Sequence, residues 1–222
     1  MKKIMMIAAM MVAAVTANAQ NEVGQITLKP TVGMNIASMT KTEGDSKVRV
    51  GIAAGVEAEY GITESFSLSA GLLYSMQGTK ASGESFDEDG DRIKSTIKFN
   101  IDYFNIPILV QYYPIQGLAI KAGVQMGFVV RNKAKVDVAV AGETFKGDGS
   151  VEEFLDDCRT LGLIRNDAKL NKFDFSIPVG LSYEYQNFVL DARYNIGVSK
   201  VIKNYSDKNS VFQLTLGYKF AL

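Results

Sequence analysis

Long stretches of the chain alternate apolar and polar residues with a period of two, which indicates β-strands that each have one apolar face. The pattern is clearest at the C-terminus, where every second residue is apolar: Phe212, Leu214, Leu216, Tyr218, Phe220 and Leu222. Eight segments show it, at about 26–36, 48–60, 66–76, 96–113, 117–131, 172–185, 187–199 and 210–222. These segments are longer than the roughly five or six residues of a typical soluble strand, and they suit a tilted membrane crossing. The sequence therefore predicts an all-β fold, an eight-stranded antiparallel transmembrane β-barrel.

The connections between these segments alternate in length. The short ones fall at 61–64, 114–116 and 186–187. The long ones are rich in Lys, Glu, Asp, Gly and Ser and fall at about 37–47, 78–95, 132–171 and 200–209. Outer-membrane barrels have short periplasmic turns and longer outer loops, so we expect the long connections outside and both termini in the periplasm.

Two features of the strand pattern are irregular. In the fourth segment Ile97, Phe99 and Ile101 are out of phase with the apolar residues from Ile106 onward, which predicts a β-bulge near residues 103–105. Pro107 and Pro178 lie inside strands, although proline cannot donate to a β-ladder. Each proline requires a bulge or a local break in the pairing.

The N-terminus has the pattern of a secretory signal peptide. Lys2 and Lys3 precede an apolar run at 4–15, and Ala-Asn-Ala at 17–19 forms a cleavage site before Gln20. We therefore predict a signal peptide at 1–19 and a single barrel domain at 20–222, located in the bacterial outer membrane. After the first 20 residues, no apolar run approaches the roughly 20 residues of a membrane-spanning helix.

Composition excludes several classes of partner. Lys and Arg number 24, as do Asp and Glu, so no net positive charge attracts nucleic acid. The single cysteine, Cys158, permits neither an intrachain disulfide nor a thiolate metal cluster. The acidic run at 84–91 lacks the spacing of a calcium loop. We predict no cofactor and no metal.

The apolar strand faces could meet lipid outside the barrel, or a ligand inside it as in a soluble lipocalin-like carrier. Aromatic residues favour lipid, because they gather near the proposed periplasmic ends as in an interfacial girdle. They are Tyr60, Phe66, Tyr112, Tyr113, Tyr183, Tyr185, Phe188, Tyr218 and Phe220. The polar faces then line the interior.

Charges of both signs lie on these polar faces. We expect them to form an interior network of Lys29, Arg49, Glu57, Glu59, Lys121, Arg131, Asp174, Glu184, Asp191, Arg193 and Lys219. An eight-stranded barrel is only wide enough inside to be filled by side chains, and buried charges must be paired. This predicts a solid polar core and no pore.

Three segments resemble a known family. FNIPILVQY at 104–112 and FDFSIPVGL at 173–181 each place Ile-Pro within an apolar strand, and LSAGLLYS precedes them at 68–75. These resemble strands of PorT-like outer-membrane β-barrel domains, and the resemblance covers essentially the whole mature chain. Some PorT-like proteins take part in a secretion apparatus, so the resemblance implies that role as an alternative function.

The C-terminus also resembles the signal by which outer-membrane barrels are recognised for assembly. The matching residues are Thr215, Gly217, Phe220 and Leu222. The alternative reading is simply the end of an amphipathic strand. The resemblance implies the barrel-assembly machinery as a partner, beside the outer-membrane lipid.

One helix is expected, in the 132–171 connection. Ser150 and Glu153 form a capping box, and Gly162 provides a C-terminal stop. Its apolar face would contain Val151, Phe154, Leu155, Cys158 and Leu161. A helix of about three turns is marginal alone. Its apolar face therefore packs either on the barrel's own rim or mouth, or on an extracellular or envelope protein.

These observations predict an integral barrel that acts as a structural or interaction protein and displays surface loops. Alternatives are a component of a secretion or envelope-assembly apparatus, a small channel, or a membrane-embedded enzyme. The chain contains no histidine, the residue most often used as a general base. We predict no enzymatic activity and no catalytic residues.

Overall fold

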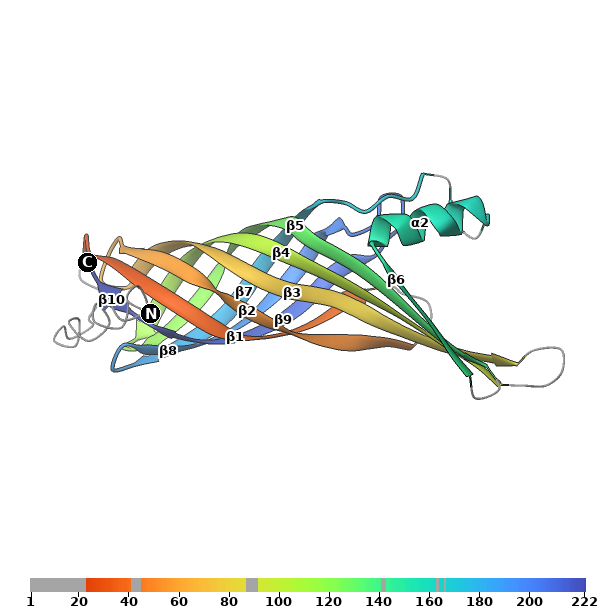
Figure 1. Cartoon of the computed structure of the whole chain (residues 1–222). Helices are drawn as coiled ribbons and strands as arrows, with labels where there is room; N and C mark the ends of the chain where they lie inside the picture. Colours follow the sequence, from red (N-terminus) through yellow and green to blue (C-terminus); the bar gives the residue numbers. More distant parts are fainter. Residues whose placement is uncertain (1–22, 41–44, 87–91, 141–142, 163, 166) are drawn as a thin grey trace, which may run out of the picture.

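The computed structural model describes residues 23–40, 45–86, 92–140, 143–162, 164–165 and 167–222. The predicted signal peptide, residues 1–19, lies outside this part of the chain. The strands form an antiparallel sheet that closes into a ring of eight, so the predicted fold class is confirmed (Figure 1). The ring contains β1 (Ile26–Thr40), β2 (Asp45–Gly61), β3 (Phe66–Phe86), β4 (Arg92–Ile115), β5 (Leu118–Val140), β7 (Phe173–Tyr185), β8 (Phe188–Lys200) and β9 (Lys208–Tyr218).

Three further elements complete the described fold. β10 (Phe220–Ala221) continues β9 and pairs with the start of β1. β6 (Glu143–Gly149) pairs with the outer end of β5, and helix α2 (Val151–Thr160) follows it. The ring closes where β1 pairs with β9, so that Val32 lies opposite both Ala54 and Leu216. In the described part of the chain, no helix is long and apolar enough to cross a membrane.

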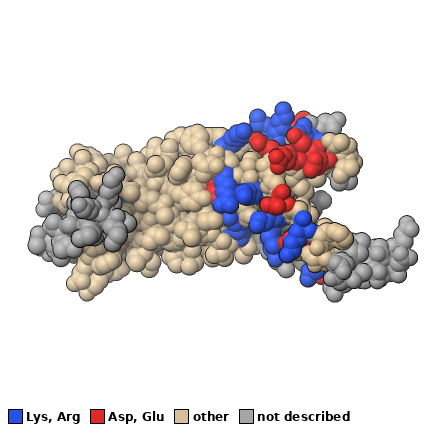
Figure 2. Space-filling view, in the orientation of Figure 1, with Lys and Arg blue, Asp and Glu red and all other residues tan. Residues whose placement is uncertain are grey.

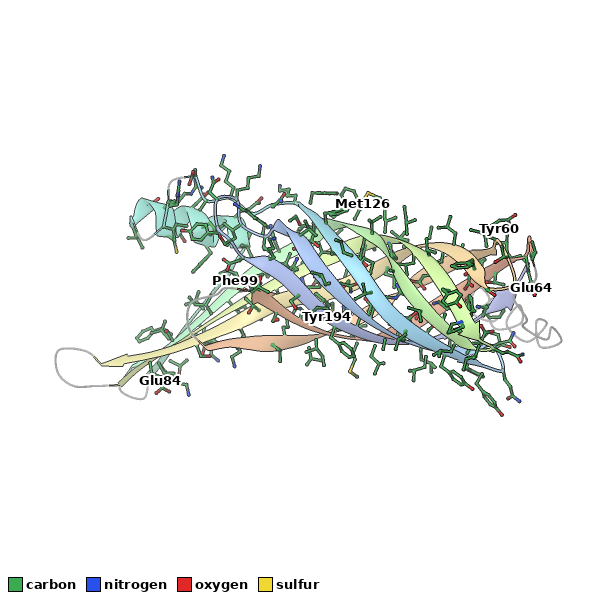
Figure 3. The ribbon with its side chains drawn as sticks, turned by 180° about the vertical axis from the view of Figure 1, so that it is seen from behind. Tyr60, Glu64, Glu84, Phe99, Met126 and Tyr194 are labelled. Atoms are coloured by element: carbon green, nitrogen blue, oxygen red, sulfur yellow. The ribbon has the colours of Figure 1, made fainter. Side chains whose placement is uncertain are left out.

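The short turns gather at one end of the barrel. They connect β2 to β3, β4 to β5, and β7 to β8, as the sequence predicts. In the last turn Gln186 and Asn187 both have positive φ, 47° and 69°, the type I′ geometry that fits the twist of a two-residue hairpin. Figure 3 shows Tyr60 and Glu64 at this end and Glu84 at the opposite end.

On one side of the ring the strands run far beyond the barrel. β3, β4 and β5 contain 21, 24 and 23 residues, whereas β7, β8 and β9 contain 13, 13 and 11. A tilted strand crosses a membrane in about 9–11 residues. With β6, the surplus residues form a sheet that projects from the end opposite the short turns (Figure 1). We call this sheet, residues 79–86, 92–100, 131–140 and 143–149, the extension.

The extension corrects the sequence prediction, which placed loops at 78–95 and 132–171. Residues 78–86, 92–95 and 132–140 are strand instead. Ile97, Val136 and Val138 continue the period of two there, with Lys, Asp and Ser between them. The charged residues that suggested loops are one face of an amphipathic sheet, and β-branched residues favour strands on the other face.

β4 changes the side on which its apolar residues lie. Ile101 is only 1% exposed, whereas Ile108, an odd number of residues away and therefore on the opposite face of the strand, is 37% exposed. The pairing of β4 with β3 has no register shift in this region. The outer apolar residues of β4 therefore face the barrel mouth, and the inner ones face outward.

The predicted bulge lies on β5 instead of β4. Asp102 pairs with Arg131 and Tyr103 pairs with Val129, which leaves Val130 as the extra residue. A bulge of this kind reverses the facing of every residue beyond it on the same strand.

The two strand prolines cause local breaks in the ladder. Pairing of β3 with β4 is interrupted beside Pro107, and pairing of β5 with β7 is interrupted beside Pro178. Both ladders resume in the same register, which places Gly71 across from Pro107 and Gly123 across from Pro178. The missing proline donors are thus accommodated without a bulge.

Aromatic side chains form two outward-facing rows around the apolar wall. The inner row, near the short turns, contains Tyr60, Phe66, Tyr112, Tyr183, Tyr185 and Phe188. The outer row, which sequence reasoning missed, contains Tyr74, Phe104, Phe128, Phe173, Tyr194 and Phe212. Its rings touch across strands, with 5.8 Å between the centroids of Tyr74 and Phe104.

The spacing of the rows fits a membrane. On β4, Phe104 and Tyr112 are eight residues apart, about 26 Å along the strand and about 20 Å along the barrel axis at a usual tilt. This is close to the roughly 25 Å apolar band of outer-membrane barrels. The two rows therefore mark the membrane boundaries.

Two exposed leucines allow a test of this placement. Leu216 lies between the two rows and is 51% exposed, whereas Leu161 follows α2 and is 71% exposed. We expect Leu216→Arg to lower the free energy of unfolding from lipid vesicles by roughly 2–4 kcal/mol, because it puts a charge near the bilayer midplane. Leu161→Arg should change it by less than about 0.5 kcal/mol. Equal losses in denaturant titrations followed by gel mobility would contradict the membrane boundaries.

Candidate functional site

Five buried charged residues meet in the middle of the barrel, and we call Lys29, Glu57, Lys121, Asp191 and Arg193 the central cluster. Lys29 Nζ lies 2.6 Å from Glu57 Oε2, and Lys121 Nζ lies 2.6 Å from Asp191 Oδ2. Arg193 joins the two carboxylates, with contacts of 2.5 Å to Glu57 and 2.7 Å to Asp191. These residues come from β1, β2, β5 and β8, so the cluster ties opposite walls of the ring together.

A second group lies nearer the short turns, and we call Glu59, Tyr113, Glu184 and Lys219 the periplasmic cluster. Lys219 Nζ lies 2.7 Å from Glu184 Oε2 and 3.2 Å from Glu59 Oε2. The Tyr113 hydroxyl donates a hydrogen bond to Glu59 Oε1. Tyr113 was predicted to belong to the aromatic girdle, which is wrong: its neighbour Tyr112 faces outward, so Tyr113 must face inward.

The two clusters balance each other in charge. The central cluster has three cations and two anions, and the periplasmic cluster has one cation and two anions. Together they form a neutral set of eight charges, as burial in a narrow interior requires. They contain eight of the eleven residues that the sequence assigned to the interior network.

Inward-facing glycines make room for the long side chains of the central cluster. A Cβ added to Gly71 would lie 2.6 Å from Glu57 Cγ, and one added to Gly217 would lie 2.9 Å from Lys29 Cγ. A Cβ at Gly180 would lie 2.9 Å from Arg193 Cγ. Because real Cβ atoms do not approach other atoms below 3.0 Å, the charged residues and the glycines opposite them act as pairs.

Arg49 and Arg131, also predicted for the interior network, lie elsewhere. Both contact Asp102 at the outer end of the barrel, at 3.4 Å and 3.8 Å, and Tyr74 donates a hydrogen bond of 2.8 Å to the same carboxylate. The side chain of Arg131 is 52% exposed, because the extra residue Val130 turns it to the outer face. Sequence reasoning missed Asp102, which lies in the outer part of β4, where the apolar residues face inward and the polar residues face outward.

Asp174 is buried below the mouth, apart from both clusters. Ser199 Oγ and Asn209 Nδ2 donate hydrogen bonds to Asp174 Oδ1 at 2.9 Å and 3.0 Å. Within the described residues it forms no ion pair, so neutral donors alone satisfy it. Asn209 Nδ2 also donates to the Tyr103 hydroxyl at 3.3 Å.

Buried amides fill other inward-facing positions along the strands. They are Asn35, Gln77, Asn105, Gln111, Gln125, Asn195 and Gln213. Among the described residues, both polar side-chain atoms of Asn105 and of Asn195 lack a hydrogen-bond partner. Because buried polar atoms are normally satisfied, we expect ordered water to bind these amides.

Helix α2 forms as predicted. The hydroxyl of Ser150 accepts a hydrogen bond of 3.0 Å from the Glu153 backbone, and the Ser150 backbone donates one of 2.8 Å to Glu153 Oε2. Cys158 is partly buried on this helix, and burial raises the pKa of its thiol, with Asp157 adding to the effect. Leu161 was predicted on the apolar face but is exposed at the C-cap.

The first turns of α2 pack on the barrel mouth through Val151, Phe154 and Leu155, and Figure 1 shows the helix at this outer end. Phe154 packs edge-on against Phe99, with 5.5 Å between ring centroids, and Figure 3 shows Phe99 at this end of the barrel. The buried residues of the mouth cluster are Met39, Ile101, Tyr103, Ala134, Val151, Leu155, Leu170 and Val201. Of the two readings of this helix, the barrel's own mouth is therefore the one observed.

The four residues that resemble an assembly signal occupy different environments. Thr215 and Gly217 are buried and face inward, Phe220 packs on Tyr218 with 4.7 Å between centroids, and Leu222 is exposed. Gly217 has a packing role beside Lys29 whatever its part in assembly.

No reactive arrangement emerges from these residues. In the described part of the chain, no three His, Cys, Asp or Glu side chains gather as metal ligands. Most of the acidic run, residues 87–91, lies outside that part. A hollow between the two clusters, lined by Lys29, Gln111 and Lys121 among others, leaves no room for a water molecule. The site is a filled interior.

Comparisons with known proteins agree with this architecture. Residues 18–203 match the family described as outer membrane protein beta-barrel domain. No curated protein matches the chain.

Several solved barrels are similar in structure. The attachment invasion locus protein Ail of Yersinia pestis has 14% identity and a TM-score of 0.46, with 90% of this chain and 100% of that chain covered. Neisserial surface protein A has 12% identity and a TM-score of 0.42, with 88% and 96% covered. The outer membrane protein OprG from Pseudomonas aeruginosa has 12% identity and a TM-score of 0.42, with 91% and 99% covered.

Removing one charge from the central cluster should destabilise the barrel. Among the described residues, Glu57→Gln leaves Lys29 and Arg193 with Asp191 as their only carboxylate partner. We expect the free energy of unfolding to fall by about 3–5 kcal/mol, the cost of leaving a buried charge uncompensated. Glu84→Gln, on an exposed strand end, should cost less than about 1 kcal/mol. Denaturant titration in lipid vesicles measures both, and similar stabilities would show that the cluster carries no such energy.

Proposed function

Because the chain belongs to the outer membrane protein beta-barrel domain family and lies in the bacterial outer membrane, we propose that it is a structural or interaction protein. Its barrel serves as an anchor without a transport pore. The extension and α2 are the parts displayed outside the cell. The observation that carries this proposal is the closure of the barrel at two levels, by the charge clusters inside and by α2 at the mouth.

The closure supports an anchor over a channel. The eight paired charges cross the interior, and removing any one of them leaves its partner buried without a compensating charge. Above them the mouth cluster places apolar side chains across the opening. An ion would have to break both layers to pass.

The extension supports an interaction role. On the side that faces the barrel axis it carries the half-buried Ile97, Val136 and Val138, and Phe145 on β6 is 67% exposed. An exposed apolar face outside the membrane is a common mark of a protein interface. The sequence analysis gave a protein partner for the connection at 132–171 as one alternative, beside packing on the barrel's own rim or mouth. Since the barrel already covers the apolar face of α2, that partner would bind the extension.

The PorT-like resemblance supports a more specific alternative, a component of a secretion or envelope-assembly apparatus. Such a component would also need contacts with other envelope proteins, so both proposals use the extension. A membrane-embedded enzyme has no support from the residues: the chain contains no histidine. We therefore propose no enzymatic activity.

Absence of a pore predicts a poor conductor. In planar lipid bilayers the purified protein should show no large, steady single-channel current. A variant that lacks residues 150–162, and with them α2, should also stay closed, because both charge clusters remain. Steady channels in the full chain would overturn the anchor proposal, and steady channels in the variant alone would assign closure to the helix.

The interaction role predicts a partner near Phe145. With a photo-crosslinking phenylalanine analogue at position 145, illumination of intact cells should yield a specific protein adduct. Leu190 is a matched control, because it is also exposed but lies in the apolar band between the aromatic rows. Gel shifts and mass spectrometry would identify the adduct. Identical patterns at both positions, or no adduct at position 145, would contradict the interaction role.

A further inference from the structure

The outer face of the extension carries a band of cations, one of which, Arg131, contacts Asp102 of the barrel. We call Lys80, Lys98, Arg131, Lys133 and Lys135 the basic strip. Lys80 lies directly opposite Lys98, and Lys98 directly opposite Lys135, so three lysines form one row across β3, β4 and β5. Figure 2 shows Lys and Arg gathered where the uncharged barrel surface gives way to the outer end.

This arrangement has a cost within the sheet itself. Like charges directly opposite each other on neighbouring strands are destabilising. Lys98 relieves part of the repulsion through an ion pair of 2.9 Å with Asp137. Among the described residues, Lys80, Lys133 and Lys135 form no ion pair, although Asp148 on β6 lies across from Lys135. Within the part of the chain that the structure describes, these three outward cations are thus left without an ion-pair partner.

The strip lies immediately beyond the membrane boundary. Phe128 and Phe104 belong to the outer aromatic row. Arg131 is three residues along β5 from Phe128, and Lys98 is six residues along β4 from Phe104. At about 3.3 Å per residue and the usual tilt, these cations lie about 7–15 Å above that row. Lipid headgroups occupy roughly the first 5–8 Å beyond the hydrocarbon core. The long lysine side chains can reach down to that level.

We propose that the basic strip binds phosphate groups of lipids in the outer leaflet. The cations point to the same side of the sheet as the lipid-facing residues below them, so headgroups surround this part of the barrel wall. Lysine and arginine are the side chains that hold phosphate, and bound phosphates remove the repulsion between the facing lysines. The bound lipid would fix the extension against the membrane surface. This inference rests on the membrane position of the barrel and on the proposed display of the extension outside the cell, but not on a protein partner for the extension.

The test compares two double variants with equal loss of charge. Lys80→Gln with Lys135→Gln removes the two lysines that flank Lys98 in the row. Lys169→Gln with Lys203→Gln is the control: both residues are exposed near the mouth, and neither forms an ion pair within the described residues. Heat-modifiable gel mobility first establishes that both variants fold.

Each folded protein, in micelles of an uncharged detergent, is titrated with diphosphoryl lipid A and with its dephosphorylated form, and bound lipid is counted by native mass spectrometry. The full chain should prefer the phosphorylated form. The strip variant should bind that form about tenfold more weakly, because each lysine near an anionic surface contributes to binding. The control should bind as the full chain does, and added salt should weaken binding.

Three results would overturn the proposal. The first is equal binding of phosphorylated and dephosphorylated lipid by the full chain. The second is an equal loss in both double variants, which would indicate a diffuse effect of net charge. The third is binding of a soluble polyanion such as heparin without binding of the phosphorylated lipid, which would assign the strip to an extracellular ligand.

Discussion

A ring of eight strands leaves an interior no wider than the side chains that fill it, and this constraint governs the rest of the molecule. The interior must be polar because the other face of every strand meets lipid, yet it has no space for bulk water. Charges inside it must therefore neutralise one another by direct contact, as Arg193 does with Glu57 and Asp191. The glycines at 71, 180 and 217 follow from the same constraint, since long side chains occupy the space beside them.

The constraint ends at the outer aromatic row, and the strands change character there. Below the row, apolar residues of β4 such as Ile108 face outward to lipid. Above it, Ile101 faces the mouth and packs beneath α2. The outer face of β4 therefore meets lipid below the row and water above it. The bulge at Val130 makes the matching change on β5 and brings Arg131 to the surface beside Asp102. Beyond the membrane boundary, apolar residues of these strands therefore face inward and charged residues face outward.

How much of this could be read from the sequence depended on whether the period of two stayed regular. It predicted the ring, the short turns and the inward position of the eight clustered charges, because alternation fixes facing within an unbroken strand. It gave a wrong facing for Arg131, because the sequence of β5 does not reveal that Val130 is an extra residue in the pairing with β4. It also gave loops in place of the extension, because the lysines there resemble loop composition.

The N-terminal cap of α2 could be predicted from the sequence for a different reason. The hydrogen bonds between Ser150 and Glu153 are local, so four residues of sequence are enough to predict them. The contact of Phe154 with Phe99 joins positions far apart in the chain, and nothing in the helix's own sequence selected the mouth over a partner. The sequence predicted that the strand pairing must break at Pro107 and Pro178. It could not predict that each proline lies opposite a glycine, because that depends on the register between the strands.

The division of the eight interior charges along the chain has a consequence for folding. β1 and β2 supply Lys29, Glu57 and Glu59, one cation and two anions; the remaining five come from Lys121 onward and include three cations and two anions. Neither part is neutral alone, and contacts such as Arg193 with Glu57 and Lys219 with Glu59 join one part to the other. Until β1 meets β9, these two parts of the chain carry opposite unbalanced charges. Closing the last seam of the barrel and neutralising its interior are therefore one event, so a barrel left open at that seam also retains uncompensated charge inside.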